Sequence, residues 1–302
     1  MKAVVVHEYG GPGKLKVEDV PDPVPGEGQV LVRVAATSVN PIDYKLRSGA
    51  LKEFMPVSFP WIPGHDVSGL VRQLGPGVTG FAAGDKVMAL TGNAYAELAA
   101  VKVEDLARVP DGLDLIEAAA LPLVTQTGEQ LITRGVEAKA GQTVLVAGAA
   151  GNVGRSAVWT AKKAGAHVIA GIRKRQMEEA AEIHADEAIA LDDDSAMEKL
   201  GFVDAVADTI GGQTAEALMG KVKQGGVFAT VLSAPANAKL HPTIRVVPVQ
   251  VASDGVLLRT LAEAVAARQL TIPIDRMVPL KDAGEAQAAA EKGGIGKVLL
   301  LA

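Results

Sequence analysis

A glycine-rich turn between a short apolar run and an alanine-rich segment constrains this chain more than any other feature. The run Val144-Leu-Val-Ala147 leads directly into Gly148, Gly151 and Gly154, and the segment Arg155–Ala164 follows. A short apolar run that ends in a glycine turn is typical of a buried strand, and an alanine-rich segment favours a helix. The sequence therefore predicts a strand, a tight turn and a helix in immediate succession.

Glycines at this spacing are typical of a dinucleotide site. They allow a tight turn, a close approach of the backbone to a pyrophosphate and close packing of helix on strand, while the first turn of the helix offers free N–H groups. A tight turn without a ligand is the alternative. The residues expected to bind the cofactor here are Gly148, Ala149, Gly151, Asn152, Val153 and Gly154.

The end of the next strand indicates which dinucleotide is bound. NAD sites place an acidic residue there to accept hydrogen bonds from the ribose, whereas this strand ends in Ala170-Gly-Ile-Arg-Lys-Arg175. Arginine can hold a 2′-phosphate through charge-assisted hydrogen bonds. Arg173 and Lys174 therefore predict NADPH as the cofactor, and a solvated basic loop is the alternative.

The rest of the chain predicts an α/β protein with two parts. Residues 1–122 contain short runs rich in β-branched residues, separated by glycine and proline clusters, which indicates a small β-barrel domain. Beyond residue 122 strands alternate with helices, which predicts a doubly wound parallel sheet of the Rossmann type. The expected strands there are 142–147, 167–170, 203–207 and 226–232, followed by a helix at 257–268 and a last strand at 297–301.

Composition excludes several classes of function. The chain has 302 residues, a net charge of −5 and no cysteine, so disulfides, thiolate zinc sites and a basic nucleic-acid surface are all excluded. No signal peptide and no apolar run long enough to span a membrane is visible, which predicts a cytoplasmic protein with no membrane partner. The acidic run Asp192–Asp194 is expected to be a solvated loop.

Several further segments, in the right order along the chain, match one enzyme family. Together with the glycine turn they resemble the medium-chain dehydrogenase/reductase superfamily, and most of all its zinc-free quinone oxidoreductase and enone reductase branch. The matching stretches are 38–49 (SVNPIDYKLRSG), 62–69 (IPGHDVSG), 81–87 (FAAGDKV), 119–123 (AALPL), 208–212 (DTIGG) and 296–300 (GKVLL).

The resemblance implies a discontinuous arrangement of domains. It assigns 1–122 and 271–302 to a GroES-like catalytic domain and 123–270 to the Rossmann NADPH-binding domain, with the substrate cleft between them. The segment 244–251 has the β-branched character of an edge strand, and Pro248 suits an edge. Because related reductases pair such edges, the expected assembly is a homodimer.

The resemblance also bears on zinc. Zinc alcohol dehydrogenases carry a cysteine where Asn40 stands and a His-Glu pair where His65 and Asp66 stand. Catalytic zinc needs three protein ligands, and only His65 of that set is evident here. No metal is therefore expected, and His65 is interpreted as a packed, hydrogen-bonded histidine.

The resemblance also implies that the segment around Asn40 lines the substrate cleft. The candidate catalytic residues are therefore Asn40, Tyr44 and Lys45. They could donate hydrogen bonds to an oxyanion or relay a proton. The alternatives are a surface pair of Lys45 with Asp43, and a Tyr44 that only packs. In similar proteins a threonine at the position of Thr127 contacts the nicotinamide ribose, and a helix cap is the alternative. Val231 and Ser233, at the end of a parallel strand, are expected to contact the nicotinamide through their backbone.

These residues predict an NADPH-dependent reductase that transfers hydride to a quinone or an α,β-unsaturated carbonyl compound, because such substrates are electrophilic without a Lewis acid. The first alternative is a non-catalytic NADPH-binding protein, such as a sensor or a crystallin-like protein. A zinc-type alcohol dehydrogenase and a methyltransferase are disfavoured, the first by the missing ligands and the second by the basic run at Arg173–Arg175.

Overall fold

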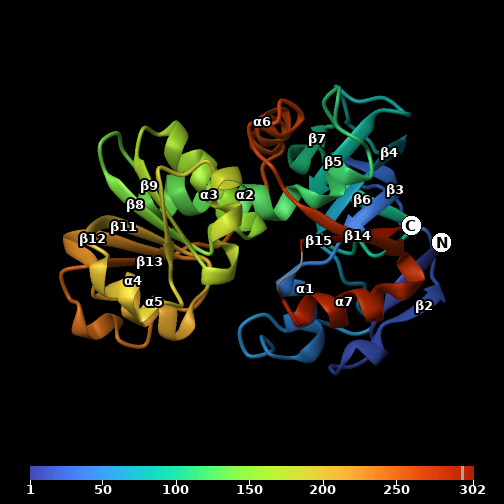
Figure 1. The fold of residues 1–302 in the computed structure, drawn as a ribbon. Coiled ribbons are helices and arrows are strands. Elements are labelled where there is room, and N and C mark those ends of the chain that lie inside the picture. The colour runs from blue at the N-terminus through green and yellow to red at the C-terminus, as the bar shows by residue number, and fades with distance from the viewer. Residues whose placement is uncertain (294–295) are drawn as a thin grey trace. The chain divides into compact units, whose positions relative to one another are not determined.

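The computed structural model describes residues 1–293 and 296–302. Contacts divide the chain into two compact units, drawn in Figure 1. The first unit comprises Met1–Leu123, Ser253–Arg268 and Ile272–Ala302, and the second comprises Val124–Ala252 and Gln269–Thr271. The sequence grouped residues 253–270 with the second part, whereas the structure places helix α6 (Gly255–Ala266) in the first unit, against β7 (Leu106–Arg108). The domain ranges 1–122, 271–302 and 123–270 stay a prediction.

The second unit is built on a six-stranded, all-parallel sheet, which confirms the predicted doubly wound fold. Its order is β10-β9-β8-β11-β12-β13, the order typical of dinucleotide-binding sheets. The strands are β8 (Thr143–Ala147), β9 (His167–Ile172), β10 (Glu187–Ala190), β11 (Val203–Asp208), β12 (Val222–Thr230) and β13 (Arg245–Pro248).

Strand β8 explains why helices cover this sheet on both sides. Val144 and Val146 belong to one apolar core, and Leu145 and Ala147 belong to another, so successive residues of β8 are buried on opposite faces. Residues of α3 and η4 join the first core, and residues of α5 join the second. The helices of this part of the chain are α2 (Pro122–Gln130), η4 (Leu131–Val136), α3 (Asn152–Lys163), η5 (Lys174–Ile183), α4 (Asp194–Lys199), α5 (Gly212–Met219) and η6 (Ala238–Leu240).

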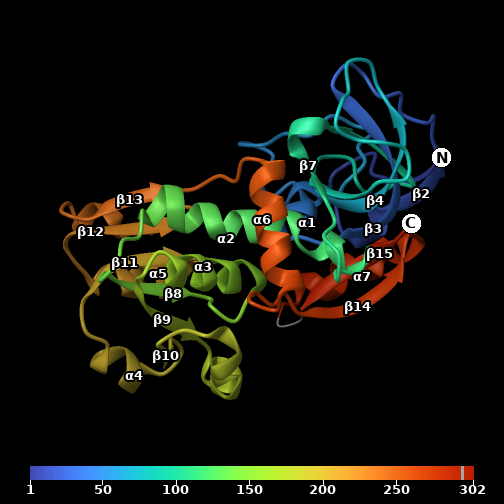
Figure 2. The same ribbon diagram turned by 90° about the horizontal axis from the view of Figure 1, so that it is seen from above.

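The first unit is built on a seven-stranded sheet in which early and late segments of the chain are neighbours. The last strand, β15 (Lys297–Leu301), lies between β14 (Ile274–Pro279) and β3 (Gln29–Ser38). In Figure 2, helix α7 (Ala283–Glu291) lies beside β14 and β15. The other strands are β4 (Asp66–Leu74), β5 (Lys86–Leu90), β6 (Leu98–Lys102), β7 and a separate pair, β1 (Lys2–Val5) and β2 (Lys16–Asp19). Short helices complete the unit: η1 (Pro12–Lys14), α1 (Pro41–Ser48), η2 (Val103–Asp105), η3 (Glu117–Ala120) and η7 (Leu280–Asp282).

Strand β13 forms one edge of the parallel sheet, as the sequence predicted for the segment around Pro248. It pairs with β12 on one side, and no other described strand pairs with it. None of the helices in residues 1–293 and 296–302 is both long and apolar enough to cross a membrane.

We expect the chain to form a homodimer through the edge strand β13, because an open edge with β-branched residues is otherwise prone to aggregation. Light scattering should give a mass twice the 31.1 kDa of one chain. A monomer alone at micromolar concentration would contradict this prediction.

Candidate functional site

Helix α1 begins in a network of buried polar groups. Asn40 precedes its first residue, Pro41, and the carboxylate of Asp43 accepts a hydrogen bond of 2.8 Å from the Asn40 backbone N–H. An Asn before the helix, a Pro at its first position and an acid at the third are typical of a helix start. Both Asn40 and Asp43 are fully buried, so this start of the helix is held within the first unit.

The Asn40 side chain links Asp66 of β4 to Lys297 of β15. Its amide nitrogen donates to Asp66 Oδ2 at 2.7 Å and its oxygen accepts from the Lys297 ammonium group. Lys297 Nζ lies 3.3 Å from Asp66 Oδ2, and Asp66 also accepts from Ser38 Oγ and, at 2.7 Å, from the Leu123 backbone N–H. Burial lowers the pKa of Lys297, although Asp66 and Asp43 act in the opposite direction. The charges of Asp66 and Lys297 therefore compensate each other in the interior.

A second buried carboxylate, Asp43, binds two aromatic side chains. Its Oδ1 lies 2.6 Å from His65 Nδ1, and its Oδ2 accepts from the Tyr95 hydroxyl at 3.2 Å. Tyr95 is buried, whereas a quarter of the His65 side chain is exposed. The interpretation of His65 as a packed, hydrogen-bonded histidine agrees with these contacts. The alternative that Asp43 pairs with Lys45 at the surface is wrong, because Asp43 is fully buried and bonded to other groups.

Tyr44 and Lys45 lie on the same helix α1 and are each partly exposed. Tyr44 packs at the margin of the apolar cluster that contains Val39 and Tyr95. Burial, together with the negative charges of Glu291 and Asp43, raises the pKa of the Tyr44 hydroxyl, which therefore stays protonated and can donate a hydrogen bond. Asn40 differs from these two residues, because its amide is committed to Asp66 and Lys297.

The donor set around Asn40 and His65 does not fit zinc. The position of a thiolate ligand is taken by the Asn40 amide, whose nitrogen donates to Asp66 and whose oxygen faces an ammonium group. Zinc requires several anionic or imidazole ligands free to converge on it. Within the described ranges no group of three or more His, Cys, Asp or Glu residues could hold a metal ion.

The glycine turn of the second unit has the geometry that the sequence predicted. Gly148 follows β8 with φ = +82°, a left-handed conformation that favours glycine, and its N–H donates to Gly171 O at 2.8 Å. A Cβ at Gly154 would lie 2.1 Å from the Gly148 carbonyl oxygen, so only glycine fits there. Ala149 is fully buried, and its N–H also bonds Gly171 O, at 3.1 Å.

The first turn of α3 leaves backbone donors available. The first bond of the helix runs from Arg155 N–H to Gly151 O at 2.8 Å, and no described side chain caps the helix. The N–H groups of Asn152, Val153 and Gly154 therefore remain as donors at the positive end of the helix dipole. A pyrophosphate fits such a turn, so the residues present suit a dinucleotide.

The basic segment after β9 differs from the expectation in one respect. The ammonium group of Lys174 pairs with Asp193 at 2.7 Å, and its backbone N–H donates to Asp192 Oδ1 at 2.6 Å. Asp192 and Asp194 are exposed, as expected of a solvated run, and Asp193 in addition caps α4, which begins at Asp194. Arg173 is exposed, directly follows β9 and forms no ion pair with a described acidic residue, so its guanidinium is available to a ligand at this strand end.

The remaining predicted contacts lie on two elements. Thr127 is buried in the middle of α2, which begins at Pro122, so the alternative that Thr127 caps the helix is wrong. Strand β12 ends at Thr230 rather than at residue 232, and the Val231 N–H donates to Asp208 O at 3.2 Å. Val231 and exposed Ser233 thus follow the carboxyl end of a parallel strand, where ligands bind in such sheets.

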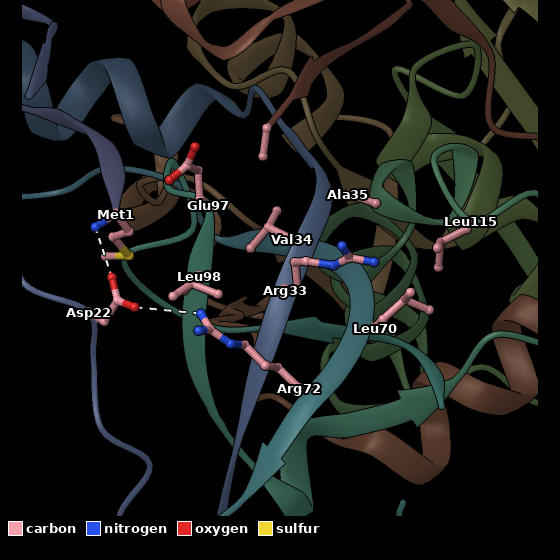
Figure 3. Close-up of a pocket in the computed structure, with 11 residues that line it drawn as sticks. Met1, Asp22, Arg33, Val34, Ala35, Leu70, Arg72, Glu97, Leu98 and Leu115 are labelled. Carbon is pink, nitrogen blue, oxygen red and sulfur yellow. Dashed lines mark hydrogen bonds and ion pairs between the residues drawn. The ribbon is translucent and has the colours of Figure 1, made fainter. Parts of the chain in front are cut away.

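A cavity of about 520 Å³ in the first unit lies apart from these residues (Figure 3). Asp22 connects the Met1 amino group, at 2.8 Å, with Arg72, at 3.5 Å, along its wall. The cavity lining includes none of the residues that the sequence proposed for catalysis or cofactor binding, and we assign it no role.

Comparisons with known proteins identify the family. Residues 26–111 match the alcohol dehydrogenase GroES-like domain, and residues 183–300 match the zinc-binding dehydrogenase domain. The structure of the quinone oxidoreductase from Coxiella burnetii superimposes with a TM-score of 0.89 at 30% identity, covering 100% of this chain and 99% of that one. The chain belongs to the medium-chain dehydrogenase/reductase superfamily, in its quinone oxidoreductase branch. The resemblance inferred from the sequence is thereby confirmed.

Other members of the superfamily carry different names. A chloroplast envelope quinone oxidoreductase homolog of Arabidopsis thaliana is 38% identical over 63% of this chain, and the match spans 60% of that relative's length. A mycobacterial structure complexed with NADPH has a TM-score of 0.88 at 29% identity, and one named NAD-dependent alcohol dehydrogenase has a TM-score of 0.88 at 27%, each covering 100% of both chains. Membership of the superfamily suggests a nicotinamide cofactor.

The sequence missed several residues of this site. Ser38, Asp66, Tyr95 and Lys297 were not proposed, although they bind Asn40, Asp43 or each other. A signal was present, because Lys297 is a single cation at the start of an apolar strand and a buried lysine requires a partner.

Proposed function

We propose that this protein is an NADPH-dependent reductase that transfers hydride to a quinone or an α,β-unsaturated carbonyl compound. The observation that carries the proposal is the first turn of α3, with its free N–H groups at Asn152, Val153 and Gly154, together with a neighbouring strand, β9, that is followed by Arg173 and not by an acid. The NADPH complex of a mycobacterial relative and the names of the quinone oxidoreductase relatives support it.

When bound, the nicotinamide ring supplies a hydride to an electrophilic carbon or to a quinone. The protein then has two tasks, which are to hold the reactants in attack geometry and to place hydrogen-bond donors at the oxygen that becomes negative. We assign the second task to Tyr44 and Lys45 on helix α1. Asn40, whose amide is committed to Asp66 and Lys297, acts as a positioning residue that fixes the start of α1.

In the second unit, backbone groups and one cation bind the cofactor in this proposal. The turn from Gly148 to Gly154 receives the pyrophosphate, and Arg173 binds the 2′-phosphate. Thr127, Val231 and Ser233 line the nicotinamide end. Lys174 contributes less than the sequence suggested, because Asp193 already pairs with its ammonium group.

Turnover tests the proposal directly. Purified protein is mixed with NADPH or NADH and a panel containing para-benzoquinone, cyclohexenone and a simple ketone. Consumption of NADPH with a quinone or an enone supports the proposal. NADPH binding without consumption would identify a non-catalytic binding protein, and reversible reduction of the ketone with NADH would identify an alcohol dehydrogenase.

Replacing Arg173 by alanine should weaken NADPH binding by roughly 10- to 150-fold, because one charge-assisted contact contributes about 1.5–3 kcal/mol. NADH, which has no 2′-phosphate, should bind the variant as it binds the parent. Fluorescence titration with both cofactors measures the two affinities.

Arg175→Ala is the matched control for Arg173→Ala, because Arg175 is also exposed but lies within η5. It should change NADPH affinity much less. Unaltered NADPH affinity in Arg173→Ala, or equal affinity of the parent for the two cofactors, would contradict the assignment.

A further inference from the structure

The pair of Asp43 and His65 has one buried end and one accessible end. The Asp43 carboxylate is fully buried and lies 2.6 Å from His65 Nδ1. A quarter of the His65 side chain is exposed, and no described residue forms a hydrogen bond with its Nε2. A carboxylate that fixes one ring nitrogen and leaves the other free is the arrangement that a proton-transferring histidine requires.

The charges around the ring favour its protonated form. The ring contacts Asp43 on α1, whose other carboxylate oxygen accepts from the Tyr95 hydroxyl, and the charges of Asp66 on β4 and Lys297 on β15 also act on it. Burial of the ring lowers the pKa of His65, and the positive charge of Lys297 lowers it further. The hydrogen bond to Asp43 and the negative charges of Asp43 and Asp66 raise it. The raising effects are the larger, so the pKa of His65 lies above its ordinary value. Two carboxylates and one ammonium group leave one negative charge, which an imidazolium compensates.

We propose that His65, held by Asp43, donates the proton that completes reduction of the substrate. This inference rests on the proposed function and names the group that the reaction needs after hydride transfer. Asp43 is the positioning residue, since it binds the ring and does not reach the substrate.

The step balances in atoms and charge. Hydride addition places two electrons and one hydrogen on the substrate and leaves an enolate or a hydroquinone anion. The Nε2–H bond of the imidazolium then breaks, a bond forms between that proton and the anion, and His65 becomes neutral. The exposed edge of the ring takes up the next proton from water, in accordance with one proton consumed per NADPH oxidised.

The other candidate donor is Tyr44, and its environment argues against proton release. Burial and the charges of Glu291 and Asp43 raise the pKa of the Tyr44 hydroxyl, which makes it a weaker acid than an ordinary tyrosine. A general acid is most effective when its pKa lies near the working pH. Tyr44 thus remains a hydrogen-bond donor to the oxyanion, and His65 supplies the proton.

The test compares the pH dependence of kcat for the parent, His65→Asn, Asp43→Asn and His7→Asn. The Asn side chain can still donate to Asp43 but carries no proton to release. His7 is the matched control, because it also bonds a carboxylate, Glu18 at 2.9 Å, but on the surface. With NADPH and cyclohexenone saturating, His65→Asn should lower kcat about 10²-fold at neutral pH.

The profile separates proton donation from a structural effect. The parent and His7→Asn should lose activity as the pH rises through the pKa of His65 and should show a solvent deuterium isotope effect. His65→Asn should lack both. Asp43→Asn should keep the alkaline loss but move it to lower pH, because the charge that raises the ring pKa is gone.

Stability provides a second measurement that needs no turnover. Because the folded-state pKa of His65 is raised, its protonation stabilises the fold fully below the ordinary value of about 6.5, and that contribution is lost as the pH rises through the folded-state pKa. The free energy of unfolding should decline more over this interval for the parent and for His7→Asn than for His65→Asn, and the difference between the curves gives the contribution of His65.

The outcomes separate the two proposals. If the parent oxidises NADPH with the enone and His65→Asn keeps the parent pH profile and isotope effect, His65 is not the donor, while the proposed function stands. If the parent oxidises NADPH with no quinone or enone, the proposed function fails and the donor role fails with it. The same pH dependence of stability in the parent and in His65→Asn would also overturn the charged state of the ring.

Discussion

Replacing Lys297 by methionine should destabilise the first unit by about 3–5 kcal/mol, because the substitution removes the cation that compensates a buried carboxylate. The Lys297 side chain is 3% exposed and that of Asp66 is not exposed at all. Methionine has nearly the same length and no charge, so packing is conserved and Asp66 is left unpaired. Each unit contains one of the two tryptophans, Trp61 and Trp159. Urea unfolding followed by Trp61 fluorescence in a Trp159→Phe background therefore reports on the first unit.

Two controls accompany Lys297→Met. Lys102→Met removes the cation of an exposed pair in the same unit, Lys102 and Glu104 at 3.2 Å, and should cost less than about 1 kcal/mol. The double variant Lys297→Met/Asp66→Asn removes both buried charges and should recover most of the loss. A single Lys297→Met variant as stable as the parent would mean that Asp66 needs no cation.

Removing a donor from helix α1 should slow hydride transfer by about 10²-fold, by analogy with other oxyanion donors. Tyr44→Phe deletes only the hydroxyl, and Lys45→Ala deletes the ammonium group. NADPH affinity should be unchanged, because neither residue belongs to the glycine turn of the second unit. Stopped-flow oxidation of bound NADPH by cyclohexenone or para-benzoquinone in a single turnover measures the rate.

Tyr9→Phe and Lys102→Ala are controls of the same chemistry in the same unit. The Tyr9 hydroxyl accepts from the Val57 N–H, and Lys102 pairs with Glu104 at the surface. Both variants should keep the parent rate. If Tyr44→Phe and Lys45→Ala also keep it, these residues only pack or solvate α1, and another group stabilises the oxyanion.

The sequence predicted the local parts of the second unit well, because short-range pattern decides them. The strand at Thr143–Ala147, the turn and the helix α3 are contiguous, and each carries its own signal in apolar residues, glycines or alanines. Boundaries were less accurate. The strand expected at 226–232 is Val222–Thr230, since Lys223 to Gly225 interrupt its apolar pattern.

Pairings between distant residues could not be predicted in the same way. His65 meets Asp43 across 22 positions, and Lys297 meets Asp66 across 231. Periodicity contains no information about which of many carboxylates a cation will face. The start of α1 could have been predicted from the sequence, because Asn40, Pro41 and Asp43 stand at the positions that such residues prefer at the beginning of a helix.

The position of β15 has a consequence for synthesis on the ribosome. Residues 124–252, which make up nearly all of the second unit, have all left the ribosome before the strand that inserts between β3 and β14 is translated. Until β15 is translated, the part of β3 that pairs with it has no partner on that side, and Asp66 lacks the ammonium group of Lys297. The nascent first unit therefore has an unpaired strand edge and a carboxylate without its cation at a time when the parallel sheet of the second unit can already be complete, which makes this stage of synthesis the one most prone to aggregation.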